Sequence, residues 1–316
     1  MIELQGLTRV FGERTAVDNL NLRVESGQIC ALIGTSGCGK STTLKMINRL
    51  IEPTSGTVLI NGEDIRDQQP ELLRRRIGYA IQGVGLFPHR TVYDNIATVP
   101  RLLNWPAKQI DQRVHELLDL LKMDFDTFAY QYPHRLSGGE QQRIGVARAL
   151  AARPELMLMD EPFGALDPLT RERLQGELKQ IQRMLGITTI LVTHDIEEAI
   201  RLADQIAVMD GGKLLQVASP AELLRNPREG FVSQLVGGEE RALRLLSLRS
   251  VGDLAQPADQ FELSDDTPCI DAGMSLRDAL ARQIWQRSAV LRVVDETGAT
   301  CGAVSLQELI NAGGRD

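Results

Sequence analysis

One short stretch places glycines, a lysine and a serine at a spacing suited to binding phosphate. Residues 34–41 fit the pattern G-x-x-x-x-G-K-[ST]. Glycines let backbone N–H groups wrap a phosphate, Lys40 brings a positive charge to the β- and γ-phosphates, and the Ser41 hydroxyl can ligate Mg²⁺. A glycine-rich turn that binds nothing is the alternative. The residues predicted to bind the nucleotide here are Gly34, Thr35, Ser36, Gly37, Cys38, Gly39, Lys40, Ser41 and Thr42.

The elements on either side of this loop supply the context that the motif needs. Residues 28–33 form a mostly apolar run that predicts a buried strand, and residues 41–47 predict a helix. A strand, a glycine loop and a helix in this order favour phosphate binding, because the helix N-terminus adds the positive end of its dipole.

A second motif ends in two acids. The apolar residues 156–159 predict a strand that leads into Asp160 and Glu161. Asp160 can hold Mg²⁺ beside Ser41, largely through water. Because side chains alternate along a strand, we expect Glu161 to point elsewhere and to act as general base for the water that attacks the γ-phosphate. The alternative is a pair of acids in a surface turn.

A third motif, residues 136–143, reads Leu-Ser-Gly-Gly-Glu-Gln-Gln-Arg. Ser137, Gly138 and Gly139 at a helix start would present N–H donors as a second phosphate-binding surface, and Ser137 and Glu140 have capping-box spacing. The string resembles the signature of the ATP-binding-cassette (ABC) ATPases. The resemblance implies that ATP is held between two chains, with the signature of one chain contacting the γ-phosphate bound by the other.

The same resemblance implies roles for four further positions. Gln82 matches the Q-loop glutamine, close to Mg²⁺ and the attacking water, and His194 matches the switch histidine that senses the γ-phosphate. Residues 164–167, ending in Asp167, resemble the D-loop at the dimer interface. Phe11 resembles the aromatic residue that stacks on adenine, although a phenylalanine near a strand end is more often a core residue.

Composition limits the remaining classes of function. The chain has 316 residues, of which 43% are hydrophobic, which is enough for a sizeable core. The net charge of -7 argues against nucleic acid as a partner. There is no apolar run of about 18 residues and no signal-peptide pattern, so we expect no membrane-spanning segment. Four scattered cysteines fit reduced thiols.

The order of the predicted elements gives the fold class. We expect an α/β P-loop NTPase fold with a mainly parallel core sheet, an antiparallel β layer and a helical subdomain at about 88–152. Domain boundaries are expected at 1–238 for the ATP-binding domain and 239–316 for a linker and a small module. The parallel strands are predicted at 156–159, 189–192 and 206–209, with helices at 169–185 and 195–203, and the antiparallel strands at 2–11, 20–24 and 57–60, the last ending in an Asn-Gly hairpin turn.

The tail predicts an α-β-β-α unit over residues 275–310 and resembles a single CBS motif. Two readings stay open: paired tails of two chains that sense ionic strength or a nucleotide, or a dimer-stabilising appendage without a ligand. Arg241, Arg244 and Arg249 favour a solvated helix face over contact with an anionic membrane.

Among ABC proteins, a transporter subunit competes with the soluble types that act in DNA repair or translation. A single cassette without a coiled-coil insertion favours the transporter subunit. Residues 33–50, 78–82, 85–89 and 95–100 resemble osmoprotectant (glycine betaine, carnitine, choline) importer ATPases, with methionine or another amino-acid-like solute as the alternative cargo.

That family implies several partners and a location. The partners are a second copy of the chain, transmembrane permease subunits, and indirectly an extracytoplasmic substrate-binding protein. The permease is expected to dock on the segment that follows Gln82 and runs through Pro88 and Tyr93, with Leu86 and Phe87 as contact residues, and a plain surface loop is the alternative. The implied location is peripheral, on the cytoplasmic face of the cell membrane.

Overall fold

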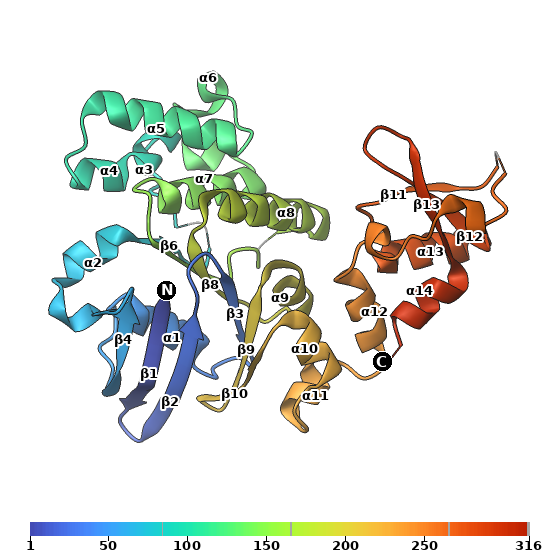
Figure 1. The fold of residues 1–316 in the computed structure, drawn as a ribbon. Helices are drawn as coiled ribbons and strands as arrows, with labels where there is room; N and C mark the ends of the chain where they lie inside the picture. Colours follow the sequence, from blue (N-terminus) through green and yellow to red (C-terminus); the bar gives the residue numbers. More distant parts are fainter. Residues whose placement is uncertain (84, 165, 265, 315–316) are drawn as a thin grey trace. The chain divides into compact units, whose positions relative to one another are not determined.

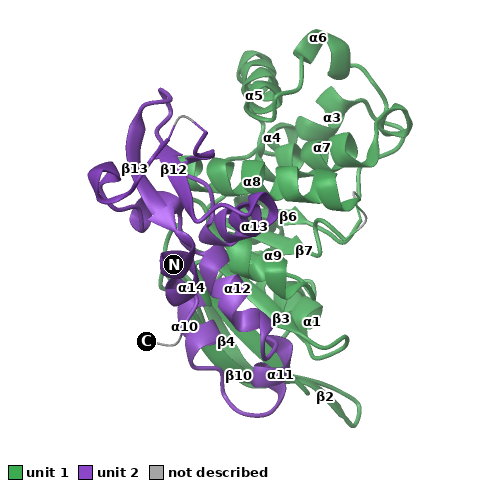
Figure 2. Cartoon of the chain, turned by 90° about the vertical axis from the view of Figure 1, so that its right-hand side faces the viewer, with its two compact units in different colours: residues 1–220 green, residues 221–316 purple. Residues whose placement is uncertain are grey.

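The computed structural model describes residues 1–83, 85–164, 166–264 and 266–314. The chain forms two compact units, residues 1–220 and 221–316, shown in different colours in Figure 2. Each unit has a hydrophobic core of its own. The domain boundary predicted after Gly238 falls inside the second of these units. No helix among the described residues is both long enough and apolar enough to cross a membrane.

A six-stranded sheet lies at the centre of the first unit (Figure 1). Its strands run in the order β10-β9-β3-β8-β7-β6, and all are parallel except β10, which is antiparallel to β9. Every residue of β3, β7 and β8 is buried, as expected for a parallel sheet covered on both faces. The bounds are β3 (Ile29–Gly34), β6 (Ile77–Ala80), β7 (Leu156–Asp160), β8 (Thr188–Val192), β9 (Gln205–Asp210) and β10 (Lys213–Ala218).

The predicted antiparallel layer is present as a second sheet with the order β2-β1-β4-β5. Asn61 and Gly62 both have positive φ, 52° and 85°, and form the hairpin turn that their sequence predicted. The strand β2 begins at Arg14, earlier than the predicted range 20–24. Register shifts near Asn19, whose φ is 47°, interrupt the alternation that marks a strand in the sequence. The bounds are β1 (Ile2–Phe11), β2 (Arg14–Val24), β4 (Ser55–Ile60) and β5 (Glu63–Asp64).

Helices complete the first unit, and those from α3 to α7 form the predicted helical region (Figure 1). The expected capping box is present at the start of α7, where the Ser137 hydroxyl accepts from the Glu140 N–H and the Glu140 carboxylate accepts from the Ser137 N–H. The bounds are α1 (Lys40–Ile47), α2 (Pro70–Arg76), α3 (Val92–Ile96), α4 (Thr98–Leu102), α5 (Ala107–Leu120), α6 (Phe125–Phe128), α7 (Gly138–Leu150), α8 (Pro168–Leu185) and α9 (Ile196–Leu202).

The second unit contains the predicted α-β-β-α arrangement and one strand that was not predicted. Its sheet has the order β11-β12-β13, with β11 parallel to β12 and β12 antiparallel to β13. Arg244 does not lie on a solvated helix face: it is 8% exposed and donates to the Val236 carbonyl. The helix α10 (Pro220–Arg225) spans the boundary, and the unit then has α11 (Phe231–Leu235), α12 (Glu240–Ser247), β11 (Cys269–Asp271), α13 (Leu276–Gln286), β12 (Val290–Val294), β13 (Thr300–Ser305) and α14 (Leu306–Ala312).

Candidate active site

The loop over residues 34–41 joins β3 to α1, and its glycines are required by close backbone contacts. Gly34 and Gly39 have φ of 150° and 106°. A Cβ on Gly34 would lie 1.9 Å from the Met209 carbonyl oxygen, and one on Gly39 would lie 2.4 Å from the Ala16 carbonyl oxygen. Any side chain at either position would therefore push the loop off the ends of the neighbouring strands.

The ammonium of Lys40 lies inside this loop. The residue is 6% exposed, and Nζ donates to the carbonyl oxygens of Gly34 and Thr35 at 2.9 Å each. Cys38 is also buried, with its Sγ 3.7 Å from Nζ, and the Thr35 hydroxyl donates to Asp210 at 2.8 Å. The loop is thus held by contacts among its own residues and by Asp210 of β9, and the Lys40 ammonium lies at its centre.

The structure brings Ser41 and Asp160 together from the start of α1 and the end of β7. The Ser41 hydroxyl donates to the Asp160 carboxylate at 2.9 Å. Burial raises the pKa of Asp160, and the Ser41 hydrogen bond opposes this shift. Two hard oxygen donors at the mouth of a phosphate-binding loop fit Mg²⁺, which takes few protein ligands and completes its shell with water and phosphate oxygens.

Glu161 and Asp160 contact different partners, but strand alternation is not the reason, and that part of the prediction was wrong. The strand β7 ends at Asp160, and Glu161 has a φ of 47°, in the left-handed region that a glutamate seldom adopts. Its N–H donates to the Val192 carbonyl at 2.9 Å, which holds this conformation in place.

Two other predicted residues converge on the carboxylate of Glu161. Gln82 Nε2 donates to Glu161 Oε2 at 3.3 Å, and His194 Nδ1 lies 3.5 Å from the same oxygen. In the hydrogen bonds of the described residues, Gln82 does not contact Asp160 or Ser41. It therefore lies beside Glu161, the candidate base, rather than beside the two candidate metal ligands. His194 and Gln82 are both solvent-exposed.

A cavity of about 470 Å³ opens over the loop and lies within the size range of small-molecule sites. Phe11 lies at this cavity, and the guanidinium of Arg9 stacks 4.3 Å from the centre of its ring. Arg14 also lines it and donates to the Gly37 carbonyl at 3.2 Å. Sequence reasoning missed both arginines, because neither belongs to a motif. The lining consists of Phe11, Arg14, Ala16, Ser36, Gly37, Gly39, Lys40, Ser41, Thr42 and Glu161.

The signature residues do not line this cavity. Ser137 and Gly138 are exposed at the start of α7, where the Ser137 hydroxyl bonds Glu140 within its own capping box. Asp167 caps α8 by accepting from the Thr170 N–H at 3.1 Å. Of the D-loop residues, Ala165 lies outside the described residues. The chain therefore presents its two candidate phosphate-binding motifs on separate surfaces, the loop at a recessed cavity and the signature at an exposed helix start.

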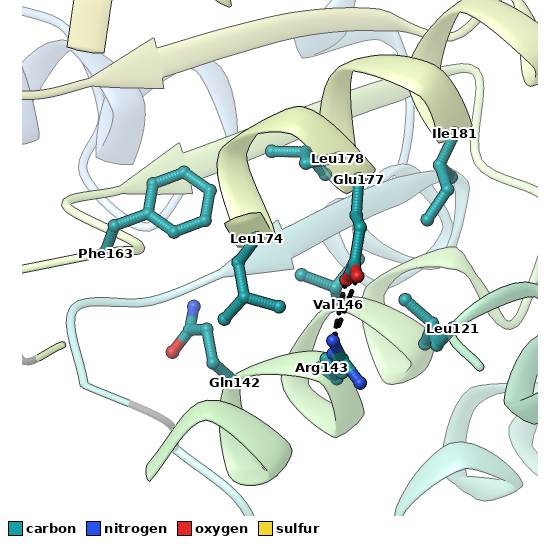
Figure 3. Close-up of a pocket in the computed structure, with 9 residues that line it drawn as sticks. All are labelled: Leu121, Gln142, Arg143, Val146, Phe163, Leu174, Glu177, Leu178 and Ile181. Carbon is teal, nitrogen blue, oxygen red and sulfur yellow. Dashed lines mark hydrogen bonds and ion pairs between the residues drawn. The ribbon is translucent and has the colours of Figure 1, made fainter. Parts of the chain in front are cut away.

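An apolar pocket between α7 and α8 has a different character (Figure 3). It holds only about 20 Å³, and Arg143 and Glu177 point toward one another from the two helices, with Arg143 Nη2 2.9 Å from Glu177 Oε2. A space of this size is a packing gap that admits at most a water molecule. The ion pair beside this gap joins α7, which begins at the signature, to α8, so the pocket is a structural feature.

The sequence and the fold of this chain are both similar to those of known ATP-binding proteins. A family described as ABC transporter matches residues 17–164. The glycine betaine uptake system ATP-binding protein YehX of Escherichia coli (strain K12) is 50% identical over 98% of this chain and 99% of its own. The choline transport ATP-binding protein OpuBA of Bacillus subtilis (strain 168) is 46% identical over 97% of this chain and 79% of its own. A dimeric ATP-binding cassette in a post-hydrolysis state with ADP and phosphate is 33% identical with a TM-score of 0.62, covering 70% of this chain and 99% of that one.

Proposed function

Because this chain belongs to the family of ATP-binding subunits of ABC transporters, whose members hydrolyse ATP, we propose that it powers the import of osmoprotectants of the quaternary-amine class. The observation that carries the proposal is the 50% identity with a glycine betaine uptake ATPase over 98% of the chain. The alignment spans both units rather than the nucleotide motifs alone.

In this proposal the phosphate groups of ATP lie in the loop over residues 34–41. The loop amides and Lys40 face the phosphates, and Lys40 exchanges its two carbonyl partners for phosphate oxygens when ATP enters. Phe11 offers its ring to adenine, with Arg9 stacked on the other side to hold the ring in place. These groups bind and orient ATP, and they stabilise charge that develops on the γ-phosphate.

Glu161 is the group proposed to deprotonate the attacking water. It lines the cavity, and two polar side chains, Gln82 and His194, contact one of its oxygens. The other oxygen is left to orient water, and the left-handed backbone at this residue aims the carboxylate into the cavity. His194 is proposed to sense the γ-phosphate and Gln82 to orient the water.

Ser41 and Asp160 would hold Mg²⁺, with Gln82 as a more distant contributor through water. When bound, the ion neutralises charge on the β- and γ-phosphates. The supporting observation is the 2.9 Å approach of the Ser41 hydroxyl to the Asp160 carboxylate, which places two oxygen ligands side by side at the cavity.

A second copy of the chain is proposed to complete each site. The signature residues Ser137, Gly138 and Gly139 are available at the surface, and a related ATP-binding cassette is dimeric. A helix N-terminus with free N–H groups binds phosphate well only when it directly faces the ligand. Within one chain these residues do not line the cavity, so the partner must supply them. Asp167 lies in the segment proposed to follow the dimer interface.

A groove of about 440 Å³ is the proposed docking site for the permease subunits. Phe87 lines it and is 38% exposed, whereas Leu86 packs against the core of the helical region, so Phe87 is the residue on which the docking prediction now depends. Arg148 reaches into the groove from α7 and donates to the Gly85 carbonyl at 2.7 Å. The permease places the chain peripherally at the cytoplasmic face of the membrane, and an extracytoplasmic binding protein delivers the solute.

The experiment that tests the cargo is uptake by the complex reconstituted in proteoliposomes with ATP inside. We expect labelled glycine betaine, choline or carnitine to accumulate, and methionine and spermidine not to accumulate. Spermidine is included because a spermidine/putrescine import ATP-binding protein of Rubrobacter xylanophilus is 45% identical, although over only 75% of this chain. Uptake of methionine or spermidine alone would replace the proposed cargo.

A further inference from the structure

The side chain of Arg171 joins two segments that flank the active site. Arg171 lies in the first turn of α8, where its Nη2 donates to the Leu166 carbonyl at 3.0 Å. Its Nη1 lies 3.7 Å from Asp195 Oδ2. Both partners of this ion pair are about one-third exposed, so solvent screens it only in part. A guanidinium can bind two acceptors at once because its donors form a rigid fork.

On one side, this contact fixes the residue that follows His194. The Asp195 carboxylate caps α9 by accepting from the N–H groups of Glu197 and Glu198, at 2.9 and 3.4 Å. The Asp195 N–H donates to the Thr193 hydroxyl at 3.0 Å. His194 therefore sits between two anchored neighbours, and its own side chain is exposed toward Glu161.

On the other side, the contact fixes a segment that packs against the signature. A Cβ added to Gly138 would lie 3.8 Å from Leu166 Cδ2, and one added to Gly139 would lie 2.8 Å from Thr170 Cγ2. Leu166 and the first turn of α8 thus form the surface on which the signature glycines rest. A shift of the signature would displace Leu166, and the Arg171 side chain links the Leu166 carbonyl to the Asp195 carboxylate.

We propose that Arg171 is a positioning residue that holds the His194 loop in register with the segment under the signature. Arg171 does not line the nucleotide cavity, so it acts on hydrolysis only through the groups it holds. When the signature engages the ATP of a second copy, Arg171 keeps His194 at Glu161 in its own site. This inference rests on the proposed role of His194.

The test uses the full-length chain and compares Arg171→Met, which keeps the apolar stem, with Arg171→Lys, which keeps the charge but not the fork. We expect kcat for ATP hydrolysis to fall about three- to tenfold in Arg171→Met, the range for one partly exposed ion pair with a hydrogen bond. KM for MgATP should stay within about twofold, because no contact to the phosphates is lost. Arg171→Lys should recover part of kcat. Arg183→Met, at the exposed far end of α8, is the matched control and should behave as wild type.

A second pair of variants separates positioning from general damage to the fold. In a His194→Ala background, adding Arg171→Met should cause no further loss of single-turnover rate, because the group that Arg171 positions is gone. An equal loss with and without His194 would overturn the inference, as would an unchanged kcat in Arg171→Met. Full kcat in His194→Ala alone would overturn the proposed role of His194 and this inference with it, whereas a loss in His194→Ala without one in Arg171→Met would overturn only the inference.

Discussion

Replacing Glu198 with glutamine should stabilise the protein increasingly as the pH rises from 4.5 to 7, and it should have little effect at pH 4. Glu198 lies in α9 and is 5% exposed, and burial raises its pKa from 4.5 to about 7. The carboxylate of Asp195 adds to the shift and that of Glu161 adds less, whereas the Thr193 hydroxyl and Arg171 oppose it. A raised pKa in an acid means that the folded state retains a proton that the unfolded state releases.

The sign and size of the effect follow from that shift. Between pH 4.5 and 7 the unfolded chain binds fewer protons than the folded chain at this site, so the free energy of unfolding falls as pH rises. The full shift corresponds to at most about 3 kcal/mol. Glu198→Gln removes this penalty, so its advantage over wild type should grow from about zero at pH 4 to about 3 kcal/mol at pH 8, a rise of roughly 6–12 °C in melting temperature for a unit of this size.

The chain offers a direct assay for this change. It has two tryptophans, and Trp285 lies in the second unit, where it is 89% exposed. In a Trp285→Phe background, the fluorescence of Trp105 reports urea unfolding of the first unit alone. Glu13→Gln, at an exposed position of that unit, is the control for loss of one charge. An advantage of Glu198→Gln that does not change with pH, or a loss of stability at pH 8, would refute the reasoning.

Three further predictions concern hydrolysis, coupling and the tail. Glu161→Gln should keep ATP binding and lower kcat by about 10²- to 10⁴-fold, measured by single-turnover hydrolysis, and a near wild-type rate would remove its role as base. Phe87→Ala should reduce transport in proteoliposomes more than it reduces the ATPase rate of the isolated chain, whereas Leu86→Ala should lower both through loss of packing; equal losses in Phe87→Ala would argue against docking there. If the tail senses ionic strength, deleting residues 239–316 should abolish the salt dependence of transport, and an unchanged dependence would favour an appendage without a sensing role.

Much of the first unit could be predicted from the sequence, because its motifs coincide with strong local patterns. The buried strands β3, β7 and β8 are mostly apolar runs. The capping box of Ser137 and the Asn-Gly hairpin turn depend on residue types that are specific to those structures. These signals are local, so they can be recognised in the sequence without knowledge of the tertiary fold. The short strand β6 and the edge strand β10 were missed, since four residues or a half-exposed pattern carry little periodic signal.

Site residues that belong to a sequence motif could be predicted. Residues that reach the site only through the packing of distant elements could not. Sequence reasoning paired Ser41 with Asp160, and the structure places them in contact. It could not foresee the left-handed backbone at Glu161, because that conformation is imposed by the neighbouring strand β8. It also missed Arg14 and Arg171, which reach their partners from other elements of the fold.

The central claim is that each ATP site needs the loop of one chain and the signature of another. Mixing two variants tests it most directly. Lys40→Ala disables the loop and Ser137→Arg blocks the signature, so each variant alone should be inactive. A hybrid of the two contains one site in which both parts are intact, so the mixture should regain ATPase activity. A mixture as inactive as either variant alone, under conditions where hybrids form, would contradict the account.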